Sequence, residues 1–182
     1  MLRKLVFAVL AGYSAGVSAD AMDINVSDET AQFVYATGYR TAELSFGALY
    51  NKTSKNWLGS ASLLALGDQS GKGSRSEAGL GAKLYAASAD EKDVLALGLG
   101  GQFRIFPGDG PLGVGGSAFY APGVLNAGDA TRFWEADVRV EYEVVKRTAN
   151  AYIGYRKIRT KLDNGPEVDV DKGAHVGIRF SF

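Results

Sequence analysis

His175 is the only histidine in this chain of 182 residues, so any imidazole-based reaction would depend on it. Such a reaction also needs a positioned nucleophile or a second base beside the imidazole. No residue stands at a spacing from His175 that would fix such a partner. We therefore interpret His175 as a hydrogen-bonding residue near the outer rim of the fold. We expect no enzymatic activity and no catalytic residue.

Two glycine-rich segments resemble nucleotide-binding loops by their letters alone. Residues 107–113 contain a literal G-x-G-x-x-G, but the dinucleotide motif needs a strand before it and a helix after it. Here Pro111 interrupts the motif and an extended pattern follows. Residues 67–74 have three spacer residues where a P-loop has four, and no helix follows. We interpret both segments as turns and expect no cofactor.

An acidic segment near the C-terminus could hold a divalent cation, because calcium prefers oxygen ligands. The spacing of its carboxylates matches no EF-hand loop, and a solvated acidic loop that binds no metal is the preferred interpretation. The chain has no cysteine, which excludes disulfides and cysteine-ligated zinc or iron–sulfur sites. The acidic residues are Asp163, Glu167, Asp169 and Asp171.

The composition is that of a folded, glycine-rich domain with a net charge of zero. The 20 Lys and Arg residues balance 20 Asp and Glu residues, which gives no support to a nucleic-acid binder. Apolar residues make up 46% of the chain, which argues against disorder. The 24 glycines are well above the usual share of about 7%. The length indicates one domain.

The elements that would position these residues are strands, because hydrophobicity alternates with period two. In residues 133–144 the apolar phase includes Trp134, Val138 and Tyr142, and nearly every residue of the other phase is charged. Alternation over twelve residues indicates a strand with one apolar and one polar face. Residues 58–66 are apolar or small on both phases, so their facing stays open. With 133–144, the predicted strands are 42–50, 58–66, 77–85, 95–105, 112–120, 148–158 and 174–182.

Eight strands are therefore expected, with ten as the alternative. Residues 31–37 also look extended and either form a lead-in or pair with residues 23–27, which would add two strands. The predicted turns and loops are 51–56, 67–76, 87–93, 107–111, 123–130, 146–148 and 159–173.

Long strands without helices must close on themselves or leave exposed edges, so the fold class is an all-β antiparallel barrel. Most of the strands have 9–12 residues, against roughly 9–11 for a strand that crosses a bilayer and roughly 5–6 for an average soluble strand. A soluble barrel with the apolar face inside is the alternative to a transmembrane barrel.

In the transmembrane reading the polar face and many glycines point inward, where six acids and five bases pair in a narrow interior. The row of charged residues on the polar face of 135–143 could also bind or guide a solute. The predicted interior charges are Glu43, Glu77, Lys83, Arg104, Glu135, Asp137, Arg139, Glu141, Glu143, Arg156 and Arg179.

Aromatic residues stand near the strand ends, as expected for girdles at the two membrane interfaces. Trp134 and Tyr142 are separated by about 26 Å along their strand, or roughly 20 Å vertically at a tilt near 40°. The predicted girdle residues are Tyr50, Trp57, Tyr120, Trp134, Tyr142 and Tyr155.

The first 19 residues predict a secretory signal peptide, with Arg3 and Lys4 before a short apolar run and a small-residue exit. Cleavage after Ala19 or after Ala21 fits the pattern. The barrel domain then spans residues 20–182. The apolar run is too short to cross a bilayer as a helix.

The ending VGIRFSF, with Phe180 and Phe182, resembles the C-terminal assembly signal of bacterial outer-membrane barrels. More narrowly, LGLGGQF at 97–103, AYIGYR at 151–156 and GAHVGIRFSF at 173–182 resemble the YfaZ family. The resemblance implies a barrel in the outer membrane of Gram-negative bacteria. The resemblance supplies no settled activity and identifies no catalytic residues.

The sequence therefore predicts a monomeric outer-membrane barrel with a charged, largely filled interior and a structural or loop-presenting role. A narrow pore for small solutes is the alternative, and a lipid-modifying enzyme or protease is a distant one. The expected partners are outer-membrane lipid or lipopolysaccharide and the barrel-assembly machinery, which would engage the C-terminal strand. Loops 51–56, 87–93, 123–130 and 159–173 are expected outside the cell, and the other turns in the periplasm.

Overall fold

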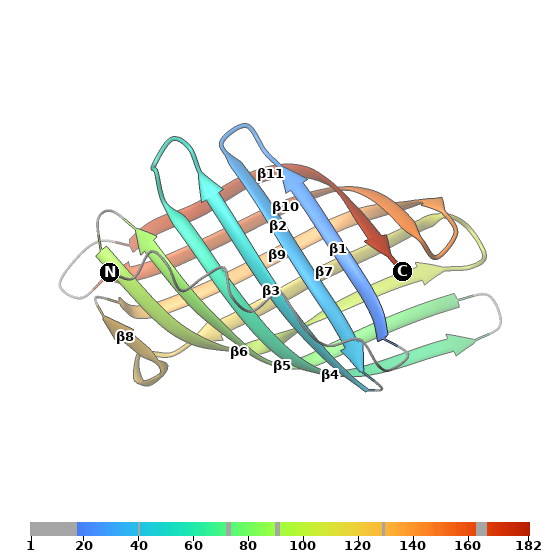
Figure 1. Cartoon of the computed structure of the whole chain (residues 1–182), viewed down its shortest axis with the longest axis horizontal. Coiled ribbons are helices and arrows are strands. Elements are labelled where there is room, and N and C mark those ends of the chain that lie inside the picture. The colour runs from blue at the N-terminus through green and yellow to red at the C-terminus, as the bar shows by residue number, and fades with distance from the viewer. Residues whose placement is uncertain (1–17, 40, 72–73, 90–91, 129, 163–166) are drawn as a thin grey trace.

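The computed structural model describes residues 18–39, 41–71, 74–89, 92–128, 130–162 and 167–182, and this part of the chain forms strands and one short 3-10 helix. No helix of the described part is long and apolar enough to cross a membrane. The strands are β1 (Ser18–Val26), β2 (Thr30–Tyr39), β3 (Ala42–Asn51), β4 (Trp57–Gly71), β5 (Ser74–Ala89), β6 (Lys92–Pro107), β7 (Leu112–Ala121), β8 (Asn126–Gly128), β9 (Ala130–Val145), β10 (Ala149–Leu162) and β11 (Glu167–Ser181), with the 3-10 helix η2 at Gly123–Leu125 (Figure 1).

The ten long strands close into an antiparallel barrel. Each pairs with the next long strand along the chain, and β1 pairs with β11 to complete the ring. The short β8 pairs with β6 beyond the end of β7, so it continues the path of β7 after η2. The terminal strands also meet through backbone hydrogen bonds of 2.9 Å in both directions between Asp20 and Phe182.

The expectation of eight strands is wrong, and the ten-strand alternative is confirmed within the described residues. β1 pairs with β2 in the register Asp23↔Val34 and Val26↔Ala31. In β1 the inward residues Asp23 and Asn25 alternate with apolar outward residues over only a short stretch. The sequence pattern of this strand is therefore weak. Their backbone pairing with β2 and β11 nevertheless closes the barrel.

Three of the predicted loops are too long, because strand pairing continues into them. β4 and β5 remain paired as far as Gly71↔Ser74, so residues 67–76 are mostly strand. In the same way, residues 87–93 and 159–173 are largely taken up by the ends of β5, β6, β10 and β11. Pairing persists there although the outward side chains are no longer consistently apolar. Turns 51–56, 107–111 and 146–148 match the prediction, and residues 123–130 contain η2 and β8.

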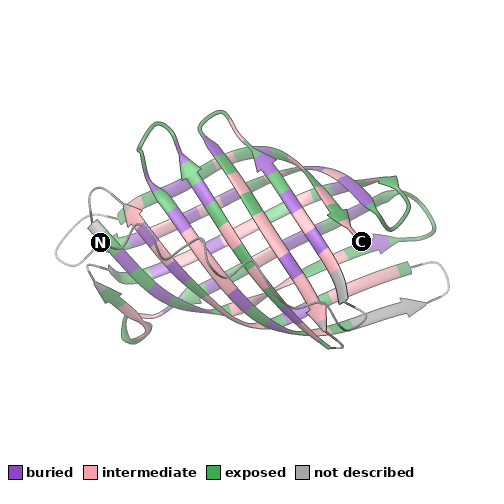
Figure 2. Cartoon of the chain, viewed as in Figure 1, coloured by how far each residue is buried: buried purple, intermediate pink, exposed green. Residues whose placement is uncertain are grey.

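Side chains alternate between the interior and the outer face along every long strand (Figure 2). Large apolar residues cover the outside, as with Leu80 at 73% and Leu63 at 60% exposure, whereas Glu141 inside is 1% exposed. β4 follows the same rule: Leu58 and Leu64 point inward and Leu63 outward. A polar interior inside an apolar shell is the arrangement of a barrel that faces lipid, not of a soluble barrel.

The predicted signal peptide, residues 1–19, lies almost entirely outside the described residues. Only Ser18 and Ala19 are described, as the first residues of β1. The signal peptide and its cleavage after Ala19 or Ala21 remain predictions.

Candidate functional site: a charged lumen with an apolar end

All eleven predicted interior charges project from the inward face of their strands, with Glu77 nearest to solvent at 37% side-chain exposure. The sequence analysis missed Asp23, Arg75 and Asp171, which also point inward. Asp23 lies in the stretch 23–27 that the ten-strand alternative would add, and Arg75 and Asp171 lie in segments predicted as a turn and a loop. The period-two pattern that continues through those segments was the signal that could have identified them.

Two ion pairs span the lumen between β5 and β9, which are not neighbours in the barrel. Lys83 Nζ lies 2.8 Å from Glu135 Oε2, and the Tyr85 hydroxyl donates to the same oxygen at 2.6 Å. Arg75 donates two hydrogen bonds of 2.9 Å to Glu143 in a bidentate pair. Because only β6 and β7 lie between these two strands in the wall, both pairs narrow the lumen on that side of the barrel.

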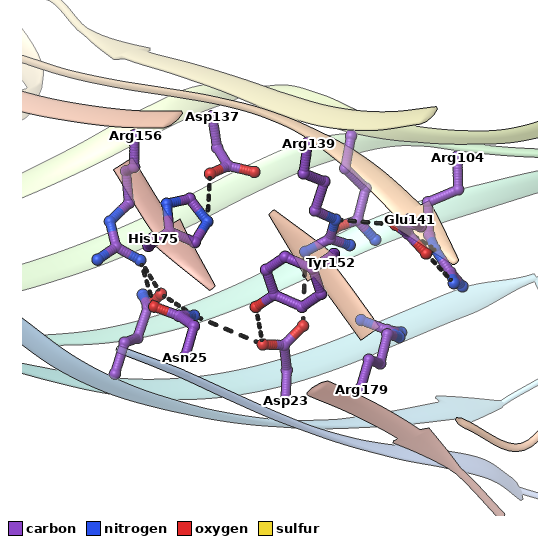
Figure 3. Close-up of polar contacts among 12 residues, drawn as sticks. Asp23, Asn25, Arg104, Asp137, Arg139, Glu141, Tyr152, Arg156, His175 and Arg179 are labelled. Atoms are coloured by element: carbon purple, nitrogen blue, oxygen red, sulfur yellow. Dashed lines mark hydrogen bonds and ion pairs between the residues drawn. The ribbon is translucent and has the colours of Figure 1, made fainter. Parts of the chain in front are cut away.

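A second network joins β1, β6, β9 and β10 through Asp23 and Glu141 (Figure 3). Arg139 lies between these carboxylates, with Nη1 3.4 Å from Asp23 Oδ2 and Nε 2.8 Å from Glu141 Oε1. Arg104 Nη2 donates to Glu141 at 2.6 Å, and the Tyr152 hydroxyl donates to Asp23. Buried charges are tolerated when they are paired in this way.

Arg156 forms a third network on the inward face of β10. Its Nε donates to Asp171 at 2.6 Å, and its Nη1 donates to Asn25 at 3.0 Å and to Gln32. Its side chain is 3% exposed. The guanidinium therefore holds together β1, β2, β10 and β11, the strands on both sides of the closing seam.

His175 lies deep inside the barrel, 4% exposed, and not near the outer rim as the sequence suggested. Its Nε2 lies 3.3 Å from Asp137 Oδ2, and the Tyr152 ring meets it edge-on at 5.8 Å between centroids (Figure 3). Its buried Nδ1 has no hydrogen-bond partner. None of the contacts described for His175 brings a hydroxyl nucleophile to the imidazole.

Between these networks lies a cavity of about 100 Å³ that includes Arg179 and His175 in its lining. Arg179 makes one long ion pair, 3.9 Å from Glu43, and its buried Nε has no hydrogen-bond partner. Glu43 also accepts a hydrogen bond of 2.8 Å from Gln102 on the facing wall.

Apolar side chains fill the interior toward the end that carries loop 51–56. The rings of Tyr85 on β5 and Phe133 on β9 have centroids 4.5 Å apart, and both residues are 0% exposed. Burying such a side chain fully contributes about 1.5–3 kcal/mol. We call this group the apolar closure. Its members are Leu49, Leu58, Leu64, Tyr85, Ala87, Val94, Ala96, Phe119, Ala121, Phe133, Ile158 and Val170.

Glycines make room for the large inward side chains. A Cβ on Gly177 would lie 2.4 Å from Cζ of Tyr152, its register partner on β10. A Cβ on Gly154 would lie 2.8 Å from the His175 ring. By contrast, a Cβ on Gly173 would meet nothing within 4 Å.

The predicted girdle residues all lie on the outer face, and four of them form two register pairs. Tyr50 stands opposite Trp57, and Tyr120 opposite Trp134. Tyr142 pairs with Leu112 toward the other end of the barrel. The predicted girdle residues are Tyr50, Trp57, Tyr120, Trp134, Tyr142 and Tyr155, and Phe180 and Phe182 of the predicted assembly signal are also exposed.

The remaining sequence motifs form no site in the described residues. Asp171 pairs with Arg156 inside, and Glu167 and Asp169 pair with Arg159 outside. Asp163 lies outside the described residues, and among the described ones no group of three potential metal ligands occurs. Residues 107–113 form the turn between β6 and β7, and residues 67–74 lie around the β4–β5 turn, whose residues 72–73 are not described.

An apolar outer face, a charged interior and closure into a ring define a transmembrane β-barrel. The chain belongs to the YfaZ family, described as YfaZ precursor, which matches residues 2–182. No curated protein matches the chain.

Two solved structures resemble the fold at low identity. One is the outer-membrane channel DcaP of Acinetobacter baumannii, with 11% identity, a TM-score of 0.39, and coverage of 88% of this chain and 54% of the channel. The chain thus spans about half the length of that channel. The other is a chain from a study of the in-meso crystallization of membrane proteins, with 13% identity, a TM-score of 0.43, and coverage of 91% and 83%.

Proposed function

We propose that this protein is a monomeric outer-membrane barrel whose lumen is closed to solutes and which acts through its outer surface and loops. The observation that carries the proposal is the apolar closure, where Tyr85 of β5 and Phe133 of β9 pack at 4.5 Å inside the barrel. Below it, the pair between Lys83 and Glu135 also spans the lumen. The role is structural or loop-presenting, and we assign it no catalytic residue.

The proposed route to this location begins with export through the signal peptide at residues 1–19. The C-terminal strand, ending in Phe180 and Phe182, would then engage the barrel-assembly machinery. The lipid contacts of the finished barrel would include lipopolysaccharide.

Single-channel recording in planar bilayers tests the closed lumen. We expect no discrete conductance from protein whose folding is established by heat-modifiable gel migration. We expect the double variant Tyr85→Ala/Phe133→Ala to show openings, because it removes the ring contact and the tyrosine bond to Glu135. Tyr142→Ala, which trims an aromatic residue on the outer face of β9, is the matched control and is expected to stay silent.

A narrow pore is the second candidate, and the polar cavity beside Arg179 is the observation that favours it. A discrete conductance from folded wild-type protein would establish the pore and refute the closed lumen. In that case Arg179→Gln should change ion selectivity, because Arg179 lines the cavity with an incompletely paired guanidinium.

A further inference from the structure

The outer face of the barrel carries a groove of about 440 Å³ between β6, β7 and β9. It arises because Ala118 and Ala136 stand opposite each other in the register of β7 and β9. The next outward pair toward the loop end is Tyr120 and Trp134, and Leu99 borders the groove on β6. Two small residues beside large ones leave a hollow with mainly apolar walls, and its volume is within the range of roughly 300–1,000 Å³ of small-molecule sites.

Cationic side chains continue the row that contains the groove. Ala136 is the register partner of Lys157 on β10, and Lys157 is the register partner of Lys172 on β11. Lys157 Nζ lies 5.5 Å from the centroid of the Trp134 ring. No ion pair of either lysine occurs among the described residues, but the Asp169 carboxylate, which binds Arg159, also attracts both lysines. Like charges directly opposite on one face of a sheet are destabilising, so this pair favours an anion between them.

Two more cations lie at the loop side of the groove. Arg132 belongs to its lining, and Lys161 stands between two register partners, Arg132 on β9 and the acidic Glu167 on β11. Arg159 lies between Lys157 and Lys161 on the outer face of β10, and it already pairs with Asp169 and Glu167. We call the four outward cations that form no ion pair in the described residues the outward basic cluster. Its members are Arg132, Lys157, Lys161 and Lys172.

We propose that the groove and the outward basic cluster together bind a phosphorylated glycolipid of the lipid A type. An acyl chain lies over Ala118 and Ala136, and the phosphates contact Lys157, Lys172 and Arg132. The apolar hollow matches a hydrocarbon chain, and the cations match the phosphates in charge. The inference rests on the proposed outer-membrane placement, with the loop end in the outer leaflet. It does not depend on whether the lumen conducts.

The two tryptophans of the chain, Trp57 and Trp134, provide a direct probe. Trp57→Phe leaves Trp134, at the groove, as the only indole. We would titrate deep-rough lipopolysaccharide into this protein, folded in uncharged detergent micelles, and follow its fluorescence. A saturable change is expected.

Charge is tested on the same background. Lys157→Gln/Lys172→Gln should weaken binding on the order of 25-fold, at about fivefold for each cation removed. Lys52→Gln/Lys55→Gln, in loop 51–56, removes the same charge elsewhere at the loop end and should leave the affinity within about twofold. Equal affinity of the first variant and the parent protein would overturn the proposal.

The groove is tested by filling it. Ala136→Phe keeps every cation and should weaken binding on the order of tenfold, the loss of about two buried methylene groups. Ala65→Phe, on the outer face of β4, is the control and should bind like the parent protein. Heat-modifiable migration of each variant establishes that a loss of binding is not a loss of the barrel. Unchanged binding by folded Ala136→Phe would remove the groove from the site.

Comparing different lipids identifies which one binds in the groove. Dephosphorylated lipid A and phosphatidylethanolamine should bind at least tenfold more weakly than the phosphorylated glycolipid. Phosphatidylglycerol that competes equally well would overturn the glycolipid assignment in favour of any anionic lipid. Conductance recorded from the same preparation keeps the two proposals separate, because a conducting barrel that binds the glycolipid contradicts only the closed lumen.

Discussion

Arg156 and Arg159 lie on the same strand, β10, but face opposite sides of the barrel wall. Arg156 is buried among Asp171, Asn25 and Gln32, whereas Arg159 forms exposed pairs with acidic residues of β11. An ion pair in solvent contributes little, but a buried carboxylate that loses its partner is costly. The side of the wall therefore decides how much each arginine contributes.

We expect Arg156→Met to lower the free energy of unfolding by about 3–5 kcal/mol, because it leaves the buried Asp171 carboxylate unpaired. The measurement is urea unfolding of the protein in detergent micelles, followed by gel migration. Arg159→Met should leave the midpoint unchanged. Arg156→Met/Asp171→Leu should recover much of the loss, and a double variant as unstable as the single one would contradict this explanation.

At the scale of the element, β11 contains glycines with different surroundings. Gly177 lies under the Tyr152 ring, whereas Gly173 has open space where a side chain would project. We expect Gly177→Ala to destabilise the barrel by about 1–3 kcal/mol, because overpacking displaces Tyr152 from Asp23. Gly173→Ala is the matched control on the same strand. Similar unfolding midpoints for the two variants would show that Tyr152 can move aside without a loss of stability.

The faces of the strands could be predicted wherever apolar and polar residues alternate, as in β9. Their number could not, because β1 presents only a short alternating stretch around Asp23 and is identified by its partners β2 and β11. The predicted loop 159–173 was too long for a related reason. Alternation continues there, but Arg159 and Lys161 take the outward positions of apolar residues.

The charged residues of the lumen could be predicted from the sequence, but their pairing and the apolar closure could not. Glu135 and Lys83 were both predicted to face the interior, yet their contact depends on the curvature of the whole barrel. Phe133 precedes Trp134, so an apolar residue occupies both phases at that point. Alternation cannot tell which of the two rings points inward.

At the scale of the molecule, the turns divide into two ends. Loop 51–56 and η2 lie at one end, and the short turn at 146–148 lies at the other. Short turns are typical of the periplasmic end of outer-membrane barrels. We therefore expect loop 51–56 to face the outside of the cell.

The absence of cysteine makes this orientation directly testable. Ser54→Cys should react in intact cells with a membrane-impermeant maleimide. Lys146→Cys, in the turn at the opposite end, should react only after the cells are permeabilised, which also shows that its thiol is accessible. Labelling of Lys146→Cys alone in intact cells would invert the topology and would move the outward basic cluster to the inner leaflet.

The interior networks connect residues that are far apart along the chain. Asp23 in β1 binds Arg139 and Tyr152, at separations of 116 and 129 residues, and Asn25 binds Arg156 at a separation of 131. Each partner is therefore absent until the last strands reach the first. Contacts of such long range slow folding, and a half-formed barrel would expose unpaired charges to lipid. Assembly must therefore shield Asp23 and Asn25 from hydrocarbon until the last strands bring their partners to β1.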